Sequence, residues 1–262
     1  MPRPINLNRL RLIRTLSLFA AVLAVINIPM TLLEYRLAEV SWGLSNLAQC
    51  LTLDSENSIP AWFSSGLLFV CALSLGFVAL NARARDDRWW KHWAALGGLF
   101  GCLSIDESVG FHEQLMAPIR GMLGEGMSSV FYFAWVIPGA AFVGIVGFAF
   151  LGFLRSLPLR TSLRFVGAGC VFVGGAIGLE VLGGWLFSVN GGQHLGYITV
   201  ATLEESCEMF GLILFLRAIL IHFEQTFGKL TFVVLPETPW KEAAGDRRMS
   251  RTDRRRPVGA VA

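Results

Sequence analysis

The sequence predicts an all-α, polytopic membrane protein: a bundle of six transmembrane helices with its N-terminus and C-terminus in the cytoplasm. The first observation is composition, since 54% of the 262 residues are hydrophobic and only 16% are charged, against about 25% charged residues in a soluble domain. Mean hydropathy is correspondingly high, at +0.57. The other two observations are the lengths of the apolar stretches and the side on which the basic residues fall.

Six stretches are long enough to cross a bilayer as helices, because a span needs about 20 mostly apolar residues. We expect spans at roughly 13–33, 61–81, 93–113, 130–153, 165–187 and 197–221. The third stretch is apolar only as far as Ile105 and turns polar at Asp106. We count its polar end as helix, with a half-span as the alternative.

The basic residues orient the bundle. If the N-terminus is inside, 20 of the 22 lysines and arginines lie in cytoplasmic segments, namely 1–14, 82–92, 154–164 and 217–262. The outer segments hold only Arg36 and Arg120. Cytoplasmic loops of membrane proteins carry this excess of basic residues, so the distribution predicts six spans with both termini inside.

The ends of the chain differ from its middle. We divide it into a basic cytoplasmic arm at 1–12, a transmembrane domain at 13–223, and a basic tail at 224–262 that we expect to be disordered. Basic residues at a membrane surface meet anionic lipid head groups, so we expect membrane lipids of the cell membrane, and no nucleic acid, as partners.

The five cysteines show no CxxC or zinc spacing and imply no disulfide framework.

Seven acids and one histidine lie within or at the outer ends of three spans. The rise of 1.5 Å per residue puts one acid of each span, Asp106, Glu180 and Glu204, about 10 Å below the outer surface. Their grouping around one cavity is therefore a hypothesis that the topology suggests. The residues are Asp106, Glu107, His112 and Glu113 at the end of the third span, Glu180 in the fifth, and Glu204, Glu205 and Glu208 in the sixth.

These acids have no basic neighbour in the sequence. Residues 93–119 and 165–216 contain no lysine or arginine. One ionised side chain in mid-membrane costs about 2.5–3.5 kcal/mol on insertion scales. The acids must therefore be protonated, hydrated in an outward-facing cavity, or bound to a metal cation.

The residue types favour a divalent metal ion. Carboxylate and imidazole side chains that face the interior of a helical bundle build dimetal sites, although those sites use a Glu-x-x-His motif that this chain lacks. We predict as metal ligands the six residues Asp106, His112, Glu113, Glu180, Glu204 and Glu208, and as catalytic acid or base Glu107 and Glu205.

Three functions remain open. In the first, a bound metal activates water or oxygen for chemistry on a lipid or other apolar substrate reached from the outer leaflet. In the second, the same acids serve a proton- or cation-coupled transporter. In the third, the chain is a non-catalytic subunit or scaffold that packs against a second copy or another membrane protein. No serine-hydrolase elbow, Walker loop, Rossmann fingerprint or HExxH motif is present.

Overall fold

The computed structural model describes residues 5–6, 8–38, 41–123, 129–228 and 231–232. The chain divides into two compact units, the helical unit Asn8–Lys229 and a second unit of Met1–Leu7 with Leu230–Ala262. In the second unit, β1 (Ile5–Asn6) pairs antiparallel with β2 (Thr231–Phe232). The expected disorder of the basic tail falls mostly outside the described residues, and the predicted boundaries at 12 and 223 stay predictions.

Five segments of the helical unit are long and apolar enough to cross a membrane. They are α1 (Arg9–Ala38), α3 (Ile59–Ala84), α7 (Val136–Ser156), the continuous segment Leu159–Asn190, and α10 (Leu195–Phe227). The prediction of an all-α, multi-pass membrane protein is thereby confirmed. The orientation, the position of the termini and the identity of the membrane stay predictions.

The third predicted span, at 93–113, is broken. It consists of α4 (Trp90–Val109), a short α5 (Phe111–Gln114) and α6 (Met116–Leu123), with a bend of 68° after α4. The described part of the chain therefore contains five continuous spans, or six if the bent pair counts as one. This result corrects the expectation of an unbroken helix over 93–113. The helix is longer than a half-span, but it bends within its polar end.

Gly110 makes the bend. Its φ of 65° and ψ of 40° are left-handed, and it ends α4 as a C-cap. A residue with a Cβ is strained in this conformation, whereas glycine is not. A Cβ on Gly110 would also overlap the carboxyl group of Glu56, which lies directly against it. The bend and the position of Glu56 therefore depend on the same glycine.

The segment Leu159–Asn190 changes its winding in the middle. It runs from α8 (Leu159–Val173) through a π-helical turn, η2 (Gly174–Leu179), into α9 (Glu180–Asn190). Such wide turns are rare and occur frequently at functional sites. Here Gly175 lies so close to α10 that a Cβ would sit 2.8 Å from the backbone oxygen of Glu204. The wide turn thus brings two acid-bearing helices into close contact.

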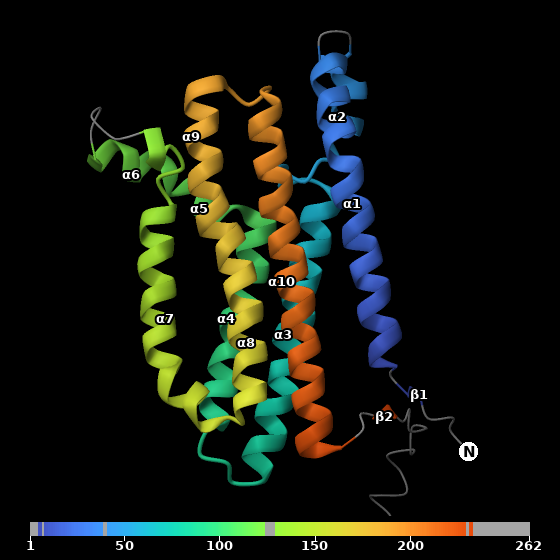
Figure 1. Ribbon diagram of the computed structural model, residues 1–262, viewed down its shortest axis with the longest axis vertical. Coiled ribbons are helices and arrows are strands. Elements are labelled where there is room, and N and C mark those ends of the chain that lie inside the picture. The colour runs from blue at the N-terminus through green and yellow to red at the C-terminus, as the bar shows by residue number, and fades with distance from the viewer. Residues whose placement is uncertain (1–4, 7, 39–40, 124–128, 229–230, 233–262) are drawn as a thin grey trace, which may run out of the picture. The chain divides into compact units, whose positions relative to one another are not determined.

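The remaining elements are small. They are α2 (Trp42–Gln49) and a single 3-10 turn, η1 (Ser129–Phe131). In Figure 1, α10 lies among the other long helices, with α1 on one side and α7 at the opposite edge. The helix α10 packs against α1, α3, α8, η2 and α9. Its buried residues Met209, Leu212 and Leu216 join those of α3 in the main apolar core.

A buried asparagine ties the loop between α2 and α3 to the bundle. Asn27, on α1, is 1% exposed. Its Oδ1 accepts a hydrogen bond from the Leu53 backbone N–H at 2.7 Å, and its Nδ2 donates to Thr202 Oγ1 on α10 at 2.8 Å. The hydroxyl of Tyr197 donates to Asp54 Oδ2 at 2.8 Å. These bonds fix the loop that carries Asp54 and Glu56.

Candidate functional site

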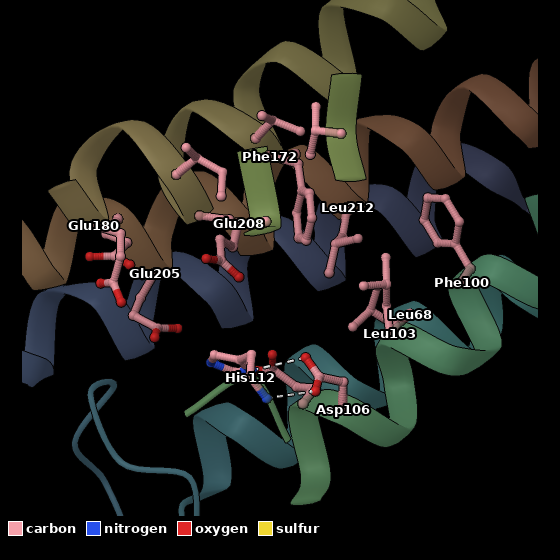
Figure 2. Close-up of a pocket in the computed structure, with 18 of the residues that line it drawn as sticks. Leu68, Phe100, Leu103, Asp106, His112, Phe172, Glu180, Glu205, Glu208 and Leu212 are labelled. Carbon is pink, nitrogen blue, oxygen red and sulfur yellow. Dashed lines mark hydrogen bonds and ion pairs between the residues drawn. The ribbon is translucent and has the colours of Figure 1, made fainter. Parts of the chain in front are cut away.

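A cavity of about 390 Å³ lies inside the helical bundle. Its size is within the range of pockets that hold small ligands. Figure 2 shows that its wall has two chemical characters: His112, Asp106 and the glutamates gather toward one end, whereas Leu68, Leu103 and Phe100 lie toward the other. We call these the polar end and the apolar arm.

All eight residues singled out from the sequence line this cavity, so the structure brings the three acid-bearing segments together. Their roles as ligands or as acid and base stay predictions. Two further acids, Asp54 and Glu56, reach the cavity from the loop between α2 and α3, which raises the number of lining carboxyl groups to nine. None of the described lining residues is a lysine or an arginine.

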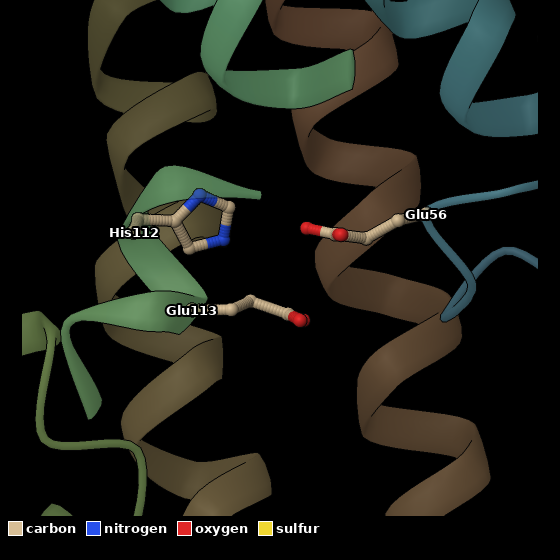
Figure 3. A group of neighbouring side chains, drawn as sticks. All are labelled: Glu56, His112 and Glu113. Carbon is tan, nitrogen blue, oxygen red and sulfur yellow. The ribbon is translucent and has the colours of Figure 1, made fainter. Parts of the chain in front are cut away.

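Three side chains come close enough to share one metal ion. Glu56, His112 and Glu113 each offer a ligand atom, and these atoms lie within 4.8 Å of one another. Figure 3 shows Glu56 and Glu113 extending toward the same space beside the imidazole of His112. Two carboxylates and one imidazole form a ligand set that suits divalent ions such as zinc or manganese.

One carboxyl oxygen of Glu56 is buried without a hydrogen-bond partner among the described residues. Its Oε1 is shielded from solvent and has no hydrogen-bond partner in the described part of the chain. Buried polar atoms are almost always paired, so an unpaired one calls for an explanation such as an ion. Burial, and next the charge of Glu113, raise the pKa of Glu56 above its ordinary value. A cation beside these carboxyl groups would offset both effects.

Asp106 lies behind His112. Its Oδ2 is 2.9 Å from His112 Nδ1, and its Oδ1 accepts a hydrogen bond from the His112 backbone N–H at 3.1 Å. A carboxylate can only accept, so Nδ1 carries the proton and Nε2 keeps its lone pair free. Histidines that bind metals are commonly fixed by a carboxylate in this way. The geometry places Asp106 to orient the imidazole of His112, and its predicted role as a metal ligand stays a prediction.

A tryptophan connects this group to the opposite wall. The Trp135 ring lies 4.7 Å from the His112 ring, centroid to centroid. Its Nε1–H donates to Glu180 Oε1 at 2.8 Å. Trp135 comes directly before α7, so one side chain spans the space between α5 and α9. The contact fixes the side chain of Glu180 as well as one face of the imidazole.

The other predicted residues face the triad without joining it. Glu180, Glu205 and Glu208 project into the cavity from α9 and α10, on the far side from His112 and Asp106 in Figure 2. Glu204, at 9% exposure, is buried beside them, and Glu107 lines the cavity from α4. The triad thus contains two of the six predicted ligands, His112 and Glu113.

Sequence reasoning missed Glu56 and Asp54. Both lie in the polar stretch TLDSENS, where acids are ordinary loop residues and no helical spacing marks them. Asp54 keeps an exposed surface where it lines the cavity, while the surrounding protein desolvates its carboxyl group. Burial raises its pKa to about 7, although the hydrogen bond from Tyr197 opposes the shift.

The fold and the cavity define a polytopic helical membrane protein with a carboxylate- and histidine-lined internal site. The chain belongs to the DUF8692 family, described as a domain of unknown function, which matches residues 15–223. That range covers every residue of the triad. It also covers the long helices, apart from the first residues of α1 and the last residues of α10. No curated protein and no solved structure is detectably similar to the chain.

Proposed function

We propose that this protein is a metal-dependent membrane enzyme that hydrolyses a lipid or another apolar substrate. Glu56, His112 and Glu113 would hold a divalent ion, with Asp106 orienting the imidazole. The observation that carries the proposal is the position of this triad at the polar end of a cavity whose opposite end is apolar. The same cavity therefore offers a place for a reactive group and a place for a hydrocarbon part.

The charge balance supports a bound cation. Nine carboxyl groups line the cavity, and its described lining residues include no lysine or arginine. Ionised carboxylates at short range repel one another strongly where water is scarce. A divalent ion between Glu56 and Glu113 supplies the missing positive charge and pairs with the free Oε1 of Glu56.

Three protein ligands suit catalysis, because they leave a position open for water. A divalent metal held there would supply a nucleophile by lowering the pKa of its bound water to roughly 7. In hydrolysis of an ester or amide, the water oxygen would bond to the carbonyl carbon while the bond from that carbon to the alcohol oxygen or amine nitrogen breaks. Glu107 or Glu205 would take the water proton and return it to the leaving alcohol or amine.

Metal analysis tests the proposal. The purified full chain is dialysed against a weak chelator. We expect it to retain about one transition-metal ion per chain, as a site with three protein ligands and one open position would. The variants Glu56→Gln and His112→Ala should lose it. Glu34→Gln is the matched control, because this acid lies on α1 outside the cavity lining. Binding of more than one ion would support the predicted ligand roles of Glu180, Glu204 and Glu208.

Other outcomes overturn the proposal. A metal-free wild-type chain that also fails to bind added zinc or manganese has no such site. A pH-dependent flux in liposomes that Glu204→Gln abolishes, without bound metal, would favour a proton- or cation-coupled transporter. Co-purification with another membrane protein, undisturbed by Glu56→Gln, would favour a scaffold.

A further inference from the structure

The inner wall of the apolar arm is firmly packed. Leu68 on α3 and Leu212 on α10 are each 2% exposed, and Phe100 on α4 is 8% exposed. Phe100 also stacks on Phe215 of α10 with ring centroids 4.6 Å apart. These side chains belong to the main core of the protein. The arm is therefore a fixed apolar recess that continues directly from the polar end.

The outer wall, formed by α7, is held differently. Of the described side chains of α7, only Val136 and Phe153, near its two ends, are fully buried. Phe153 packs edge-on against Trp93 at 4.7 Å between centroids. Between these two anchors, Val146 and Gly147 line the cavity and Phe142 is 48% exposed. Figure 1 shows α7 at the edge of the bundle.

The glycines of α7 show where this wall faces space. A Cβ on Gly147 would meet no described atom within 4 Å, although Gly147 lines the cavity. Gly144 is equally unobstructed but does not line the cavity. The middle of α7 thus has the cavity on one face and the surroundings of the protein on the other. Around a membrane-spanning helix, those surroundings are lipid chains.

We propose that the apolar arm holds one hydrocarbon chain of a membrane lipid, which enters from the bilayer beside the middle of α7 and lies with its polar end at the Glu56–His112–Glu113 triad. The described side chains that line the arm are apolar, so a polar occupant would find no side-chain hydrogen-bond partner among them. A cavity of about 390 Å³ is near the lower limit for ligand pockets, which fits one chain better than two. This inference names the substrate class of the proposed enzyme, but chain binding itself requires no metal.

Photo-crosslinking tests it. The full chain is reconstituted in phosphatidylcholine vesicles that contain a small fraction of phosphatidylcholine with a diazirine near the end of one acyl chain. After irradiation, we expect label on Leu68 and Leu212, which lipid outside the bundle cannot reach. Label confined to outward residues of α7 such as Ile145 and Phe148, which are 67% and 81% exposed, would overturn the inference.

Paired variants separate the arm from the outer surface. Gly147→Trp fills the arm, so the inner-wall label should fall about tenfold. That change corresponds to a loss of about 1.4 kcal/mol in the free energy of chain binding. Gly144→Trp adds the same side chain outside and should leave that label unchanged. On α8, Gly169→Trp and Gly167→Trp repeat the comparison, because only Gly169 lines the cavity. Equal labelling within both pairs would contradict the inference.

Metal analysis of the same samples keeps the two proposals apart. Gly147→Trp is expected to retain its metal, because the triad lies at the polar end. Inner-wall label on a chain that binds no metal would leave the lipid site standing and refute the metalloenzyme. Bound metal with no inner-wall label would refute the lipid site alone.

Discussion

Asp106 and His112 are joined by two hydrogen bonds across the bend after α4, one to the backbone N–H and one to Nδ1. The first fixes the position of the residue and the second fixes the ring. We expect Asp106→Asn to weaken metal binding by about 10- to 100-fold, as is typical when the partner of a ligating histidine is removed. Titration of the metal-free protein with zinc measures this. Asp86→Asn, in the loop before α4, is the control, and equal affinities for the two variants would refute the orienting role.

Gly110→Ala should disturb both the bend and the metal site. The left-handed backbone strains a residue with a Cβ by roughly 1–2 kcal/mol, and the new methyl group would displace the carboxyl group of Glu56. We expect a lower unfolding temperature and weaker metal binding together. Gly98→Ala, on the same helix α4 at a position with open space around it, should change neither. Full metal affinity in Gly110→Ala would show that Glu56 is not a ligand.

Asn27→Ala should loosen the loop that carries Glu56. The substitution leaves the backbone N–H of Leu53 buried without an acceptor, which costs about 1–3 kcal/mol. Thermal unfolding in detergent measures this loss. Asn81→Ala is the control, because Asn81 makes only an exposed hydrogen bond to Phe77 of its own helix. If the two variants lost the same stability, the bonds of Asn27 would not be what holds the loop.

Asp54 predicts a pH dependence of stability. Its pKa is raised from an ordinary value of 3.8 to about 7 in the folded protein, chiefly by burial. Between these values the folded state binds the proton more tightly than the unfolded state does. The free energy of unfolding contributed by this group therefore falls as pH rises from about 4 to about 7. Asp54→Asn removes the titrating group while an oxygen remains to accept the hydrogen bond from Tyr197.

The measurement is the unfolding temperature at a series of pH values between about 4 and 8. We expect the wild type to lose more stability across this range than Asp54→Asn does, because other cavity acids act equally in both proteins. Asp86→Asn is again the matched control and should follow the wild type. Identical pH profiles for the wild type and Asp54→Asn would contradict the shifted pKa.

The spans could be predicted because the bilayer allows few alternatives. A chain in hydrocarbon must satisfy every backbone hydrogen bond internally, so apolar stretches of the right length become helices. The common depth of Asp106, Glu180 and Glu204 followed from the rise per residue alone. The grouping of these acids around one cavity could therefore be anticipated before any side chain was placed.

Other parts of the site have no local signal. The position of Glu56 depends on Asn27, which is 26 residues from Leu53 in the chain and fixes that loop through a single amide group. Gly110 could be identified as small but not as left-handed, because the residues around it do not show that α4 ends and the chain bends at this position. The hydrogen bonds from Asp106 to His112 also have no local signal, since the sequence does not distinguish a carboxylate that binds a metal from one that orients a histidine.

The wide turn at Gly174–Leu179 affects how this helix has to be interpreted in related sequences. A helical wheel assumes a constant rotation of about 100° per residue. A π-turn accommodates one extra residue without advancing the face, so α8 and α9 belong to two different wheels. A projection drawn straight through both would place Glu180 about one residue's rotation away from Trp135. If the turn wound as ordinary α-helix with all of its residues retained, the molecule itself would show that misplacement, with the apolar character of the span unchanged.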